Sequence, residues 1–334
     1  PGMVAPRRVV LLSLLHRAGA PVARLTHAAA QYQELRLHPD LFDPERVRTE
    51  WLHPDLVRWL SSTEAGEVCE TSSLVRQETR EIYSFPLLSE RACIALMEEV
   101  AHFASTGIEA RRPNSMNNYG LILNDIGLRP SLDAVQRHVA PVLASLFPTE
   151  AGALDGHHSF VVAYESGKDT KLDMHTDDSD VTVNACLGDE FEESGLSFCG
   201  DAGAADHRHL SFRYTHARGR AVVHLGRRRH GADDIRAGTR LNLVMWHYNP
   251  EYRLSPEFNR RKGLYARESG PPDPACVSLT HDRDAHLHPT PGRVAPGHAV
   301  NAWCPPPGAE YEGFEGILGR YGQVDPASRN LPVD

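Results

Sequence analysis

Two segments in the first half of the chain have the hydrophobic spacing of helices. From Ser89 onward, apolar residues recur at intervals of three and four positions, and serine is a common helix cap. A second amphipathic segment runs from Leu132 to Phe147, with its apolar residues on one face. The pattern therefore predicts two helices, each lying against an apolar surface.

After about residue 155 the helical spacing gives way to short β-rich runs, which are separated by turns rich in Gly and Asp. The predicted strands cover residues 159–164, 181–187, 196–198, 220–225 and 240–248. Because helices come first and antiparallel-type strands follow, the order favours an α+β fold. We expect a double-stranded β-helix (jelly roll) core buttressed by the helices.

This pattern divides the chain into three predicted parts. Residues 1–84 are expected to form an N-terminal helical or irregular region, in which Leu-His-Pro-Asp-Leu occurs twice, at 37–41 and 52–56. Two copies are too few for a solenoid, so we interpret them as similar turns that lead into helices. Residues 85–265 would hold the support helices and, from about 155, the double-stranded β-helix. Residues 266–334 would form a Pro- and Gly-rich C-terminal arm.

The composition is that of a folded protein and argues against some functions. The chain has 334 residues, 41% of them hydrophobic, which is enough for a large core. Its formal net charge of −9 argues against binding nucleic acid through the phosphates. No apolar run approaches the roughly 18–20 residues that span a bilayer, so no membrane partner is expected. The charge and spacing do not indicate an oligomeric state.

Six cysteines are spread along the chain without a CxxC pair, at positions 69, 93, 186, 199, 276 and 304. Their spacing indicates neither a zinc knuckle nor a disulfide framework. We therefore expect mostly reduced thiols and a cytoplasmic location. A targeting segment stays open as an alternative, because Arg7 and Arg8 precede a short apolar run at 9–15.

Non-haem iron oxygenases hold Fe(II) with two histidines and one carboxylate on one face of the metal. The usual sequence trace is His-x-Asp, followed some tens of residues later by another histidine. Three His-x-Asp motifs occur here, starting at His38, His53 and His175. The first two have proline between the ligands and precede the β-rich region, so we reject them. The third lies between two β-like runs, which would place His175 and Asp177 in the mouth of a barrel.

His230 and Arg240 follow Asp177 in the order that this chemistry needs. On adjacent antiparallel strands the two side chains could face the same cavity. A planar guanidinium can bind the distal carboxylate of 2-oxoglutarate through two parallel hydrogen bonds. Each residue alone has an ordinary explanation, as a surface histidine or as an arginine paired with Asp233 or Asp234. The joint order of His-x-Asp, His and Arg is what predicts an Fe(II)- and 2-oxoglutarate-dependent oxygenase.

Further polar residues are candidates for binding the co-substrate or the substrate. On strand alternation, Tyr164 and Asn184 could point inward and hydrogen-bond 2-oxoglutarate. Tyr164 could equally be a residue of the pocket wall whose hydroxyl is hydrogen-bonded locally. Asn184, if buried, would need a hydrogen-bond partner. The polar stretch 112–120 could line the substrate entrance or simply form turns. Its candidate residues are Asn114, Asn117, Asn118 and Tyr119.

The motifs together resemble the catalytic domain of procollagen lysyl hydroxylases and, more distantly, prolyl 4-hydroxylases. The segments that carry this resemblance are 160–164, 174–187, 195–198, 230–231 and 238–246. The stretch 112–120 resembles a closer family, 2-oxoglutarate and iron-dependent oxygenase domain-containing protein 2. The resemblance covers about 85 to 250. One departure is Glu193-Ser194-Gly195, where the relatives tend to have a glycine pair, and it puts the substrate rim in doubt.

The resemblance implies a double-stranded β-helix in which His175, Asp177 and His230 hold Fe(II) and Arg240 binds 2-oxoglutarate. It implies a dioxygenase that hydroxylates a C–H bond while 2-oxoglutarate is decarboxylated to succinate. Dioxygen is then the other co-substrate, and ascorbate is a further cofactor that the resemblance suggests.

The substrate is the least determined part of the prediction. A lysine- or proline-like peptidyl side chain is the first choice, and a free amino acid or small natural product is the second. A hypothesis of another class is a non-catalytic, metal-bound binding module. Zinc hydrolysis on the same ligands is a further alternative, but the motif offers no obvious general base.

Overall fold

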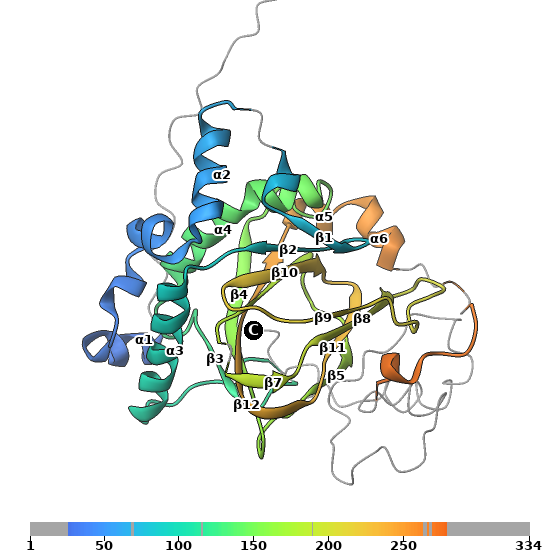
Figure 1. The fold of residues 1–334 in the computed structure, drawn as a ribbon. Coiled ribbons are helices and arrows are strands. Elements are labelled where there is room, and N and C mark those ends of the chain that lie inside the picture. The colour runs from blue at the N-terminus through green and yellow to red at the C-terminus, as the bar shows by residue number, and fades with distance from the viewer. Residues whose placement is uncertain are drawn as a thin grey trace, which may run out of the picture.

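The computed structural model describes residues 26–278, apart from 68–69, 115, 189, 263–265 and 267–268. The α-helices in this part of the chain are α1 (His27–Tyr32), α2 (Pro54–Glu64), α3 (Glu90–Ser105), α4 (Arg129–Leu146), α5 (Pro250–Arg253) and α6 (Pro256–Lys262). Short 3-10 helices are η1 (Gln33–Leu35), η2 (Pro39–Phe42), η3 (Pro44–Arg46), η5 (Thr71–Ser73) and η6 (Pro274–Cys276), and η4 (Val47–Trp51) is a π-helix. Figure 1 shows α1 to α4 to one side of the strands.

The strands pair antiparallel throughout the described residues and form two sheets. They are β1 (Arg76–Thr79), β2 (Ile82–Pro86), β3 (Gly120–Ile122), β4 (Gly156–Glu165), β5 (Leu172–His175), β6 (Val181–Cys186), β7 (Phe191–Glu193), β8 (Leu196–Asp201), β9 (Phe212–Tyr214), β10 (Arg220–Leu225), β11 (Arg228–Ala232) and β12 (Ile235–Tyr248). The large sheet has the order β1-β2-β10-β6-β12-β4-β3, with β7 also paired to β12. The small sheet has the order β5-β11-β8-β9.

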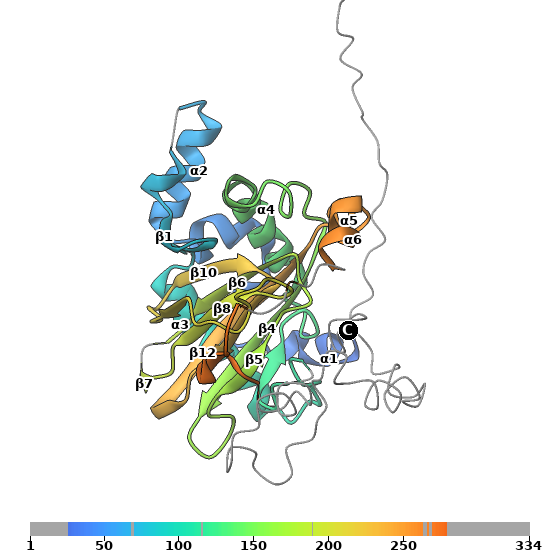
Figure 2. The ribbon, with the colours of Figure 1, turned by 90° about the vertical axis from the view of Figure 1, so that its right-hand side faces the viewer.

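The central strands of the large sheet are buried on both faces, which explains their nearly continuous apolar runs. On β12, Leu243 and Met245 point into the core that contains the helices. Val244, between them, belongs to a second cluster on the opposite face, with Phe160 of β4 and Phe198 of β8. Because successive side chains of a strand alternate between faces, one face of the sheet packs on helices and the other faces the small sheet. Figure 2 shows the long strands β12 and β4 running side by side.

The fold is therefore an α+β double-stranded β-helix buttressed by helices, as the sequence predicts. All five predicted strands are present, with slightly different ends. The large sheet also takes in β1 and β2, from a segment that was expected to be helical or irregular. The short strands β5 and β11, which carry His175 and His230, were not predicted.

The two predicted helices are confirmed as α3 and α4. Ser89 caps α3, because its Oγ accepts a hydrogen bond from the backbone N–H of Ala92 at 3.1 Å. Both copies of Leu-His-Pro-Asp-Leu lead into helices, η2 at Pro39 and α2 at Pro54. Proline suits the first helical turn, since its missing N–H would have no partner inside the helix there.

The expectation of reduced thiols is wrong for one pair of cysteines. Cys199 of β8 and Cys276 of η6 form a disulfide, although 77 residues separate them in sequence. The spacing gave no signal because only the folded chain brings η6 against β8. Cys93 and Cys186 are free and buried. Cys69 and Cys304 lie outside the described residues.

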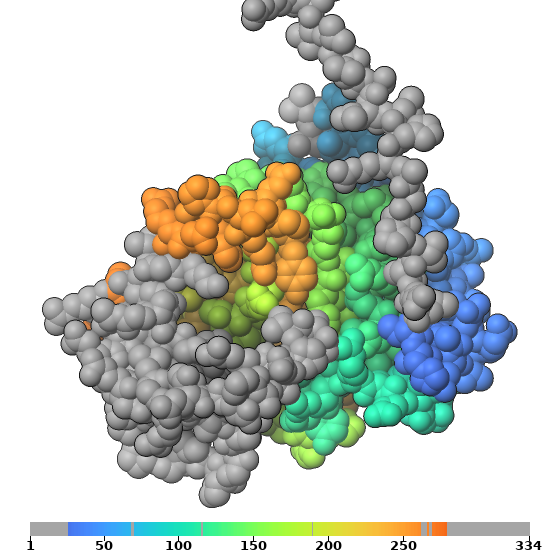
Figure 3. Space-filling view, turned by 180° about the vertical axis from the view of Figure 1, so that it is seen from behind, coloured from blue at the N-terminus to red at the C-terminus, as the bar shows by residue number. Residues whose placement is uncertain are grey.

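Parts of the prediction concern residues that the structure does not describe. These are the apolar run at 9–15 and the C-terminal arm beyond residue 278. Among the described helices, none is long and apolar enough to cross a membrane. Seen from behind in Figure 3, α5 and α6 (orange) lie at the surface, away from the N-terminal elements (blue).

A buried histidine of β12 should make the fold sensitive to acid. His247 is fully buried on the helix-facing side of the large sheet, and its Nδ1 donates a hydrogen bond to Oε1 of Gln136 at 2.8 Å. Burial lowers the pKa of His247 to about 3, from an ordinary value of 6.5. The neutral histidine is therefore compatible with folding above pH 6.5, and stability is lost as the pH falls toward 3.

The variant His247→Leu should remove this acid sensitivity. For wild type, the pKa difference predicts that about 2 kcal/mol of unfolding free energy is lost between pH 7 and pH 5 through this one residue. Urea unfolding at both pH values measures the loss for the two proteins. The variant should lose about 2 kcal/mol less than wild type, and equal losses would contradict the assignment.

Candidate metal and co-substrate site

Three side chains from the small sheet and the loop after β5 converge on one point. His175 is the last residue of β5, Asp177 follows two residues later, and His230 lies in β11 directly opposite His175. One potential ligand atom from each residue lies within 4.8 Å of the other two. Nε2 of His175 is 3.4 Å from Oδ1 of Asp177, and Nε2 of His230 is 3.7 Å from Oδ2 of Asp177.

Neighbouring groups fix how these side chains are oriented. Nδ1 of His175 donates to the carbonyl of Asp173 at 2.7 Å, and Nδ1 of His230 donates to the carbonyl of Arg228 at 2.9 Å. Since each Nδ1 carries the proton, each Nε2 presents a lone pair toward Asp177. Thr182 Oγ1 donates to Oδ2 of Asp177 at 2.6 Å and holds the carboxylate in place. Hydrogen bonds of this kind orient the ligands of metal sites.

The ionisation of these groups suits a divalent metal. Burial lowers the pKa of His230 to about 3, so its imidazole is neutral at physiological pH. Although Asp177 is buried, its pKa lies well below its usual value, so the carboxyl is ionised. Two neutral imidazole nitrogens and one carboxylate oxygen form the donor set that non-haem Fe(II) takes. The residues present therefore fit the metal.

The loop that carries Asp177 is closed by a glycine turn between β10 and β11. The backbone N–H of Asp177 donates to the carbonyl of Gly226 at 2.9 Å, and the N–H of Gly226 donates to the carbonyl of Asp180 at 3.2 Å. A Cβ at position 226 would lie 2.0 Å from the carbonyl oxygen of Ser179. The close approach of the two chain segments therefore requires glycine.

Arg240 lies on the facing sheet and lines the same pocket as the three residues. It is 1% exposed, and its guanidinium carbon is 4.4 Å from the ring centroid of Tyr164, its partner on β4. No carboxylate among the described residues forms an ion pair with it. Burial lowers the pKa of Arg240, so an anionic partner would relieve the cost of burying this charge. The site thus contains a buried cation without a carboxylate partner among the described residues.

The turn at Glu193-Ser194-Gly195, where this chain departs from its relatives, contacts Arg240. The carbonyls of Ser194 and Gly195 accept hydrogen bonds from Nη1 of Arg240, the second at 3.1 Å. Glu193 and Ser194 both have φ of +64°, in the left-handed region that favours glycine. The turn therefore keeps a glycine-like backbone with two other residues, and this backbone supports the guanidinium.

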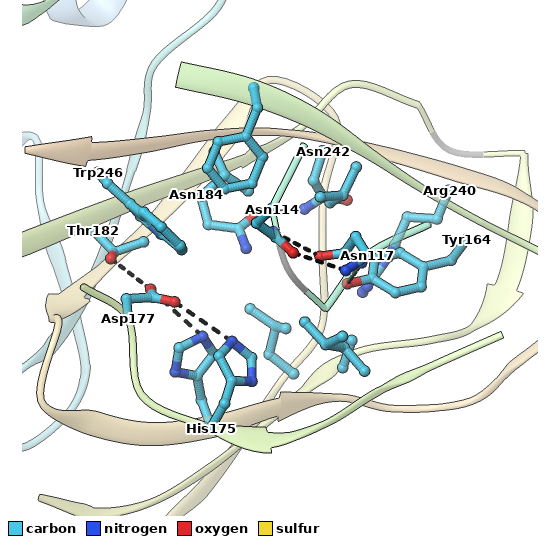
Figure 4. A pocket seen from close by; sticks show the side chains of 17 residues that line it. Asn114, Asn117, Tyr164, His175, Asp177, Thr182, Asn184, Arg240, Asn242 and Trp246 are labelled. Carbon is cyan, nitrogen blue, oxygen red and sulfur yellow. Dashed lines mark hydrogen bonds and ion pairs between the residues drawn. The ribbon is translucent and has the colours of Figure 1, made fainter. Parts of the chain in front are cut away.

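The triad and Arg240 line one shared pocket (Figure 4). Its lining is Asn114, Asn117, Phe160, Val162, Tyr164, Leu172, His175, Asp177, Thr182, Asn184, Leu196, His230, Ala232, Arg240, Asn242, Val244 and Trp246. Both predicted co-substrate residues, Tyr164 and Asn184, are in it. So are Asn114 and Asn117, whereas Asn118 and Tyr119 are not.

A directional chain of hydrogen bonds links the 112–120 stretch to Tyr164, which packs against Arg240. Nδ2 of Asn114 donates to Oδ1 of Asn117 at 2.9 Å, and Nδ2 of Asn117 donates to the hydroxyl oxygen of Tyr164 at 3.2 Å. Because Tyr164 accepts in this chain, its own O–H is available as a donor toward the pocket. Figure 4 shows Tyr164 and Arg240 together, at the far side of the pocket from His175 and Asp177.

The prediction that His230 and Arg240 lie on adjacent strands is wrong, although both line the predicted cavity. β11 belongs to the small sheet and β12 to the large sheet, so the two residues face each other across the pocket. Sequence reasoning also missed Thr182, Asn242 and Trp246. Strand alternation could have found them, because they lie an even number of residues from Asn184 or Arg240.

The two rejected His-x-Asp motifs lie elsewhere on the fold. His38 contacts Glu98, with 2.7 Å between Nε2 and Oε2. His53 caps α2, where its Nδ1 accepts a hydrogen bond from the N–H of Asp55. Neither histidine lines the pocket.

Comparisons with known proteins agree with the site. The model of the OGFOD2-like domain matches residues 29–152. Human 2-oxoglutarate and iron-dependent oxygenase domain-containing protein 2 is 37% identical over 51% of this chain and 49% of its own length. The Danio rerio protein of the same name is 32% identical over 66% of each chain. Human multifunctional procollagen lysine hydroxylase and glycosyltransferase LH3 is 28% identical over 51% of this chain and 24% of its own.

This chain spans about half the length of most of the curated relatives that it matches. The predicted resemblance to lysyl hydroxylases is confirmed, and it is more distant than the resemblance to 2-oxoglutarate and iron-dependent oxygenase domain-containing protein 2. The pocket holds a two-histidine, one-carboxylate cluster facing a buried arginine, as a 2-oxoglutarate- and iron-dependent oxygenase requires. The chain belongs to the 2-oxoglutarate and iron-dependent oxygenase domain-containing protein 2 family.

Proposed function

We propose that this protein is a dioxygenase that hydroxylates a C–H bond with Fe(II), dioxygen and 2-oxoglutarate. The observation that carries the proposal is the shared pocket, with His175, Asp177 and His230 at one side and Arg240 at the other, a buried cation that forms no ion pair with any described carboxylate. A metal-only binding module would have no use for a buried arginine that faces its metal. Iron bound by the three residues would supply the activation of dioxygen, coupled to decarboxylation of 2-oxoglutarate to succinate.

The residues of this chain would bind and orient the co-substrate. Arg240 would hold the distal carboxylate of 2-oxoglutarate by charge-assisted hydrogen bonds. The hydroxyl of Tyr164, which Asn117 leaves free to donate, would add a second hydrogen bond to the same carboxylate. Asn184 and Asn242 pair with each other at 2.6 Å, and they would flank the co-substrate between the two sheets.

For the substrate, we propose a peptidyl side chain. The distant relative's name, procollagen lysine hydroxylase, is one support for a peptide. Among the described residues that line the pocket, Asp177 is the single carboxylate, and a bound metal would engage it. A lysine ammonium would then enter without a counter-charge, which costs free energy. A neutral, proline-like side chain therefore suits this lining better, and a small neutral natural product is the alternative.

Succinate formation from 2-oxoglutarate tests the proposed activity directly. Wild-type protein loaded with Fe(II) in air, with and without ascorbate, should produce succinate even without a prime substrate, at a slow uncoupled rate. His175→Ala should abolish this production. His38→Ala is the matched control, because it removes the histidine of a His-x-Asp motif that lies outside the pocket, and it should leave the rate unchanged.

The outcome also separates the alternative functions. No succinate and no 2-oxoglutarate binding, from folded and iron-loaded wild type, would refute the oxygenase and favour the binding module. Once turnover is shown, peptides with proline or lysine targets and small neutral compounds can be compared by how much each one accelerates succinate release.

A further inference from the structure

A third buried histidine, His224, borders the metal site but belongs to the opposite sheet. It lies on β10, directly across from Thr182 of β6, and is fully buried. Its ring centroid is 4.5 Å from that of His230 and 5.2 Å from that of Phe198. The imidazole therefore stands beside the proposed ligands without being part of their sequence motif.

The hydrogen bonds of His224 fix which of its nitrogens faces the site. Nδ1 is 2.9 Å from the carbonyl oxygen of Leu225, which can only accept, so Nδ1 carries the proton. Nε2 then holds a lone pair, and it is buried without a hydrogen-bond partner among the described residues. The nearest carboxylate atom is Oδ2 of Asp177 at 4.0 Å, too far for a hydrogen bond.

Two acceptors thus face each other across a buried gap. Oδ2 of Asp177 already accepts the hydrogen bond of Thr182 and has no proton to offer. A buried acceptor without a donor costs free energy, so such groups are nearly always satisfied by some partner. Nε2 of His224 therefore needs a hydrogen-bond donor, which would lie beside Asp177 in the proposed metal site.

Direct ligation by His224 does not fit this geometry. Ligand atoms at about 2.1 Å from one metal ion are at most about 4.2 Å apart. Nε2 of His224 meets this limit toward Asp177 but not toward all three proposed ligands. The side chains whose ligand atoms all lie within 4.8 Å of one another are His175, Asp177 and His230, without His224. His224 can consequently reach the metal only through a bridging donor.

We propose that His224 is a positioning residue whose Nε2 accepts a hydrogen bond from a water molecule coordinated to the metal. The inference rests on the proposed function, since it requires a metal in the triad. By holding one coordinated water on the side of β10, His224 would leave the side toward Arg240 to 2-oxoglutarate. It would thereby influence both metal affinity and the orientation of the co-substrate.

Binding of Mn(II), measured by titration calorimetry, tests this role without requiring turnover. His224→Leu removes the acceptor and should weaken Mn(II) binding about tenfold, as changes at partners of metal ligands do. His224→Gln can place a carbonyl oxygen near the position of Nε2, and it should bind Mn(II) within about threefold of wild type. Water-proton relaxation of the Mn(II) complexes should show faster exchange of coordinated water in the leucine variant alone.

His247→Leu is the matched control. His247 is likewise fully buried, with a bonded Nδ1 and an unpartnered Nε2, but it faces the helices. This variant should bind Mn(II) as wild type does, and thermal unfolding of the apo proteins checks that each variant folds. Equal Mn(II) affinity in wild type and His224→Leu, or equal losses in the Leu and Gln variants, would overturn the role of His224. If wild type binds no Mn(II), the proposed metal centre itself is refuted, and the role of His224 is refuted with it.

Discussion

Replacing Asp177 with alanine should lower the affinity for Fe(II) by more than about 100-fold and remove succinate formation. Loss of a partner that only orients a metal ligand typically costs 10–100-fold, so loss of the carboxylate ligand itself should cost more. The two histidines would remain, but the charge that balances the metal would be gone. Titration with Fe(II) without oxygen measures the affinity, and succinate release in air measures the activity.

The adjacent residue provides the control for this experiment. Asp178 is largely exposed and contacts Arg253, so Asp178→Ala removes the same charge without touching the pocket. It should retain both Fe(II) binding and turnover. If Asp177→Ala binds Fe(II) as tightly as wild type while remaining folded, then the triad is not the metal site.

Replacing Arg240 with methionine should raise the 2-oxoglutarate concentration that is needed for half-maximal turnover by about 100-fold or more. Each hydrogen bond to a charged group contributes about 1.5–3 kcal/mol, and the variant would lose two of them. Methionine keeps much of the apolar volume beside Tyr164 but carries no charge. Fe(II) affinity should change little, because Arg240 lies across the pocket from the triad. Succinate release at varied 2-oxoglutarate concentrations gives the measurement.

Two further variants sharpen this result. Arg240→Lys keeps the charge but not the planar pair of donors, so its loss should be intermediate. Arg236→Met removes an exposed arginine from the same strand and should behave as wild type. An unchanged requirement for 2-oxoglutarate in folded Arg240→Met would show that the co-substrate binds elsewhere.

The sequence predicts those site residues whose roles can be recognised from the order and spacing of residue types along the chain. The order His175, Asp177, His230 and Arg240 could be recognised because these residue types and spacings reflect the chemistry of the metal and the co-substrate. Rejecting the motifs at His38 and His53 needed only the proline between the ligands and the absence of flanking strands. The strand pattern likewise fixed the double-stranded β-helix.

Other features of the site that were not predicted depend on contacts between distant segments. His224 looks like any histidine in an apolar run, and only the packing of β10 against the small sheet brings it to Asp177. β11 reads as a charged turn because Arg228 and Arg229 precede His230, yet both arginines are buried and hydrogen-bonded. Arg228 forms ion pairs with Asp201 and Glu81, and Arg229 donates to the carbonyl of Cys276. No local pattern reveals these partners, because they come from other segments.

The disulfide between Cys199 and Cys276 has a consequence for the chain when it is unfolded. It closes a loop of about 77 residues, which carries β9, β10, β11 and β12. By the chain-entropy model, a ring of this size removes conformational freedom worth about 4.5 kcal/mol from the denatured ensemble. His230 and Arg240 both lie within that ring. Even without any tertiary structure, these two residues, one from each side of the pocket, would therefore remain covalently confined to one closed segment of the chain.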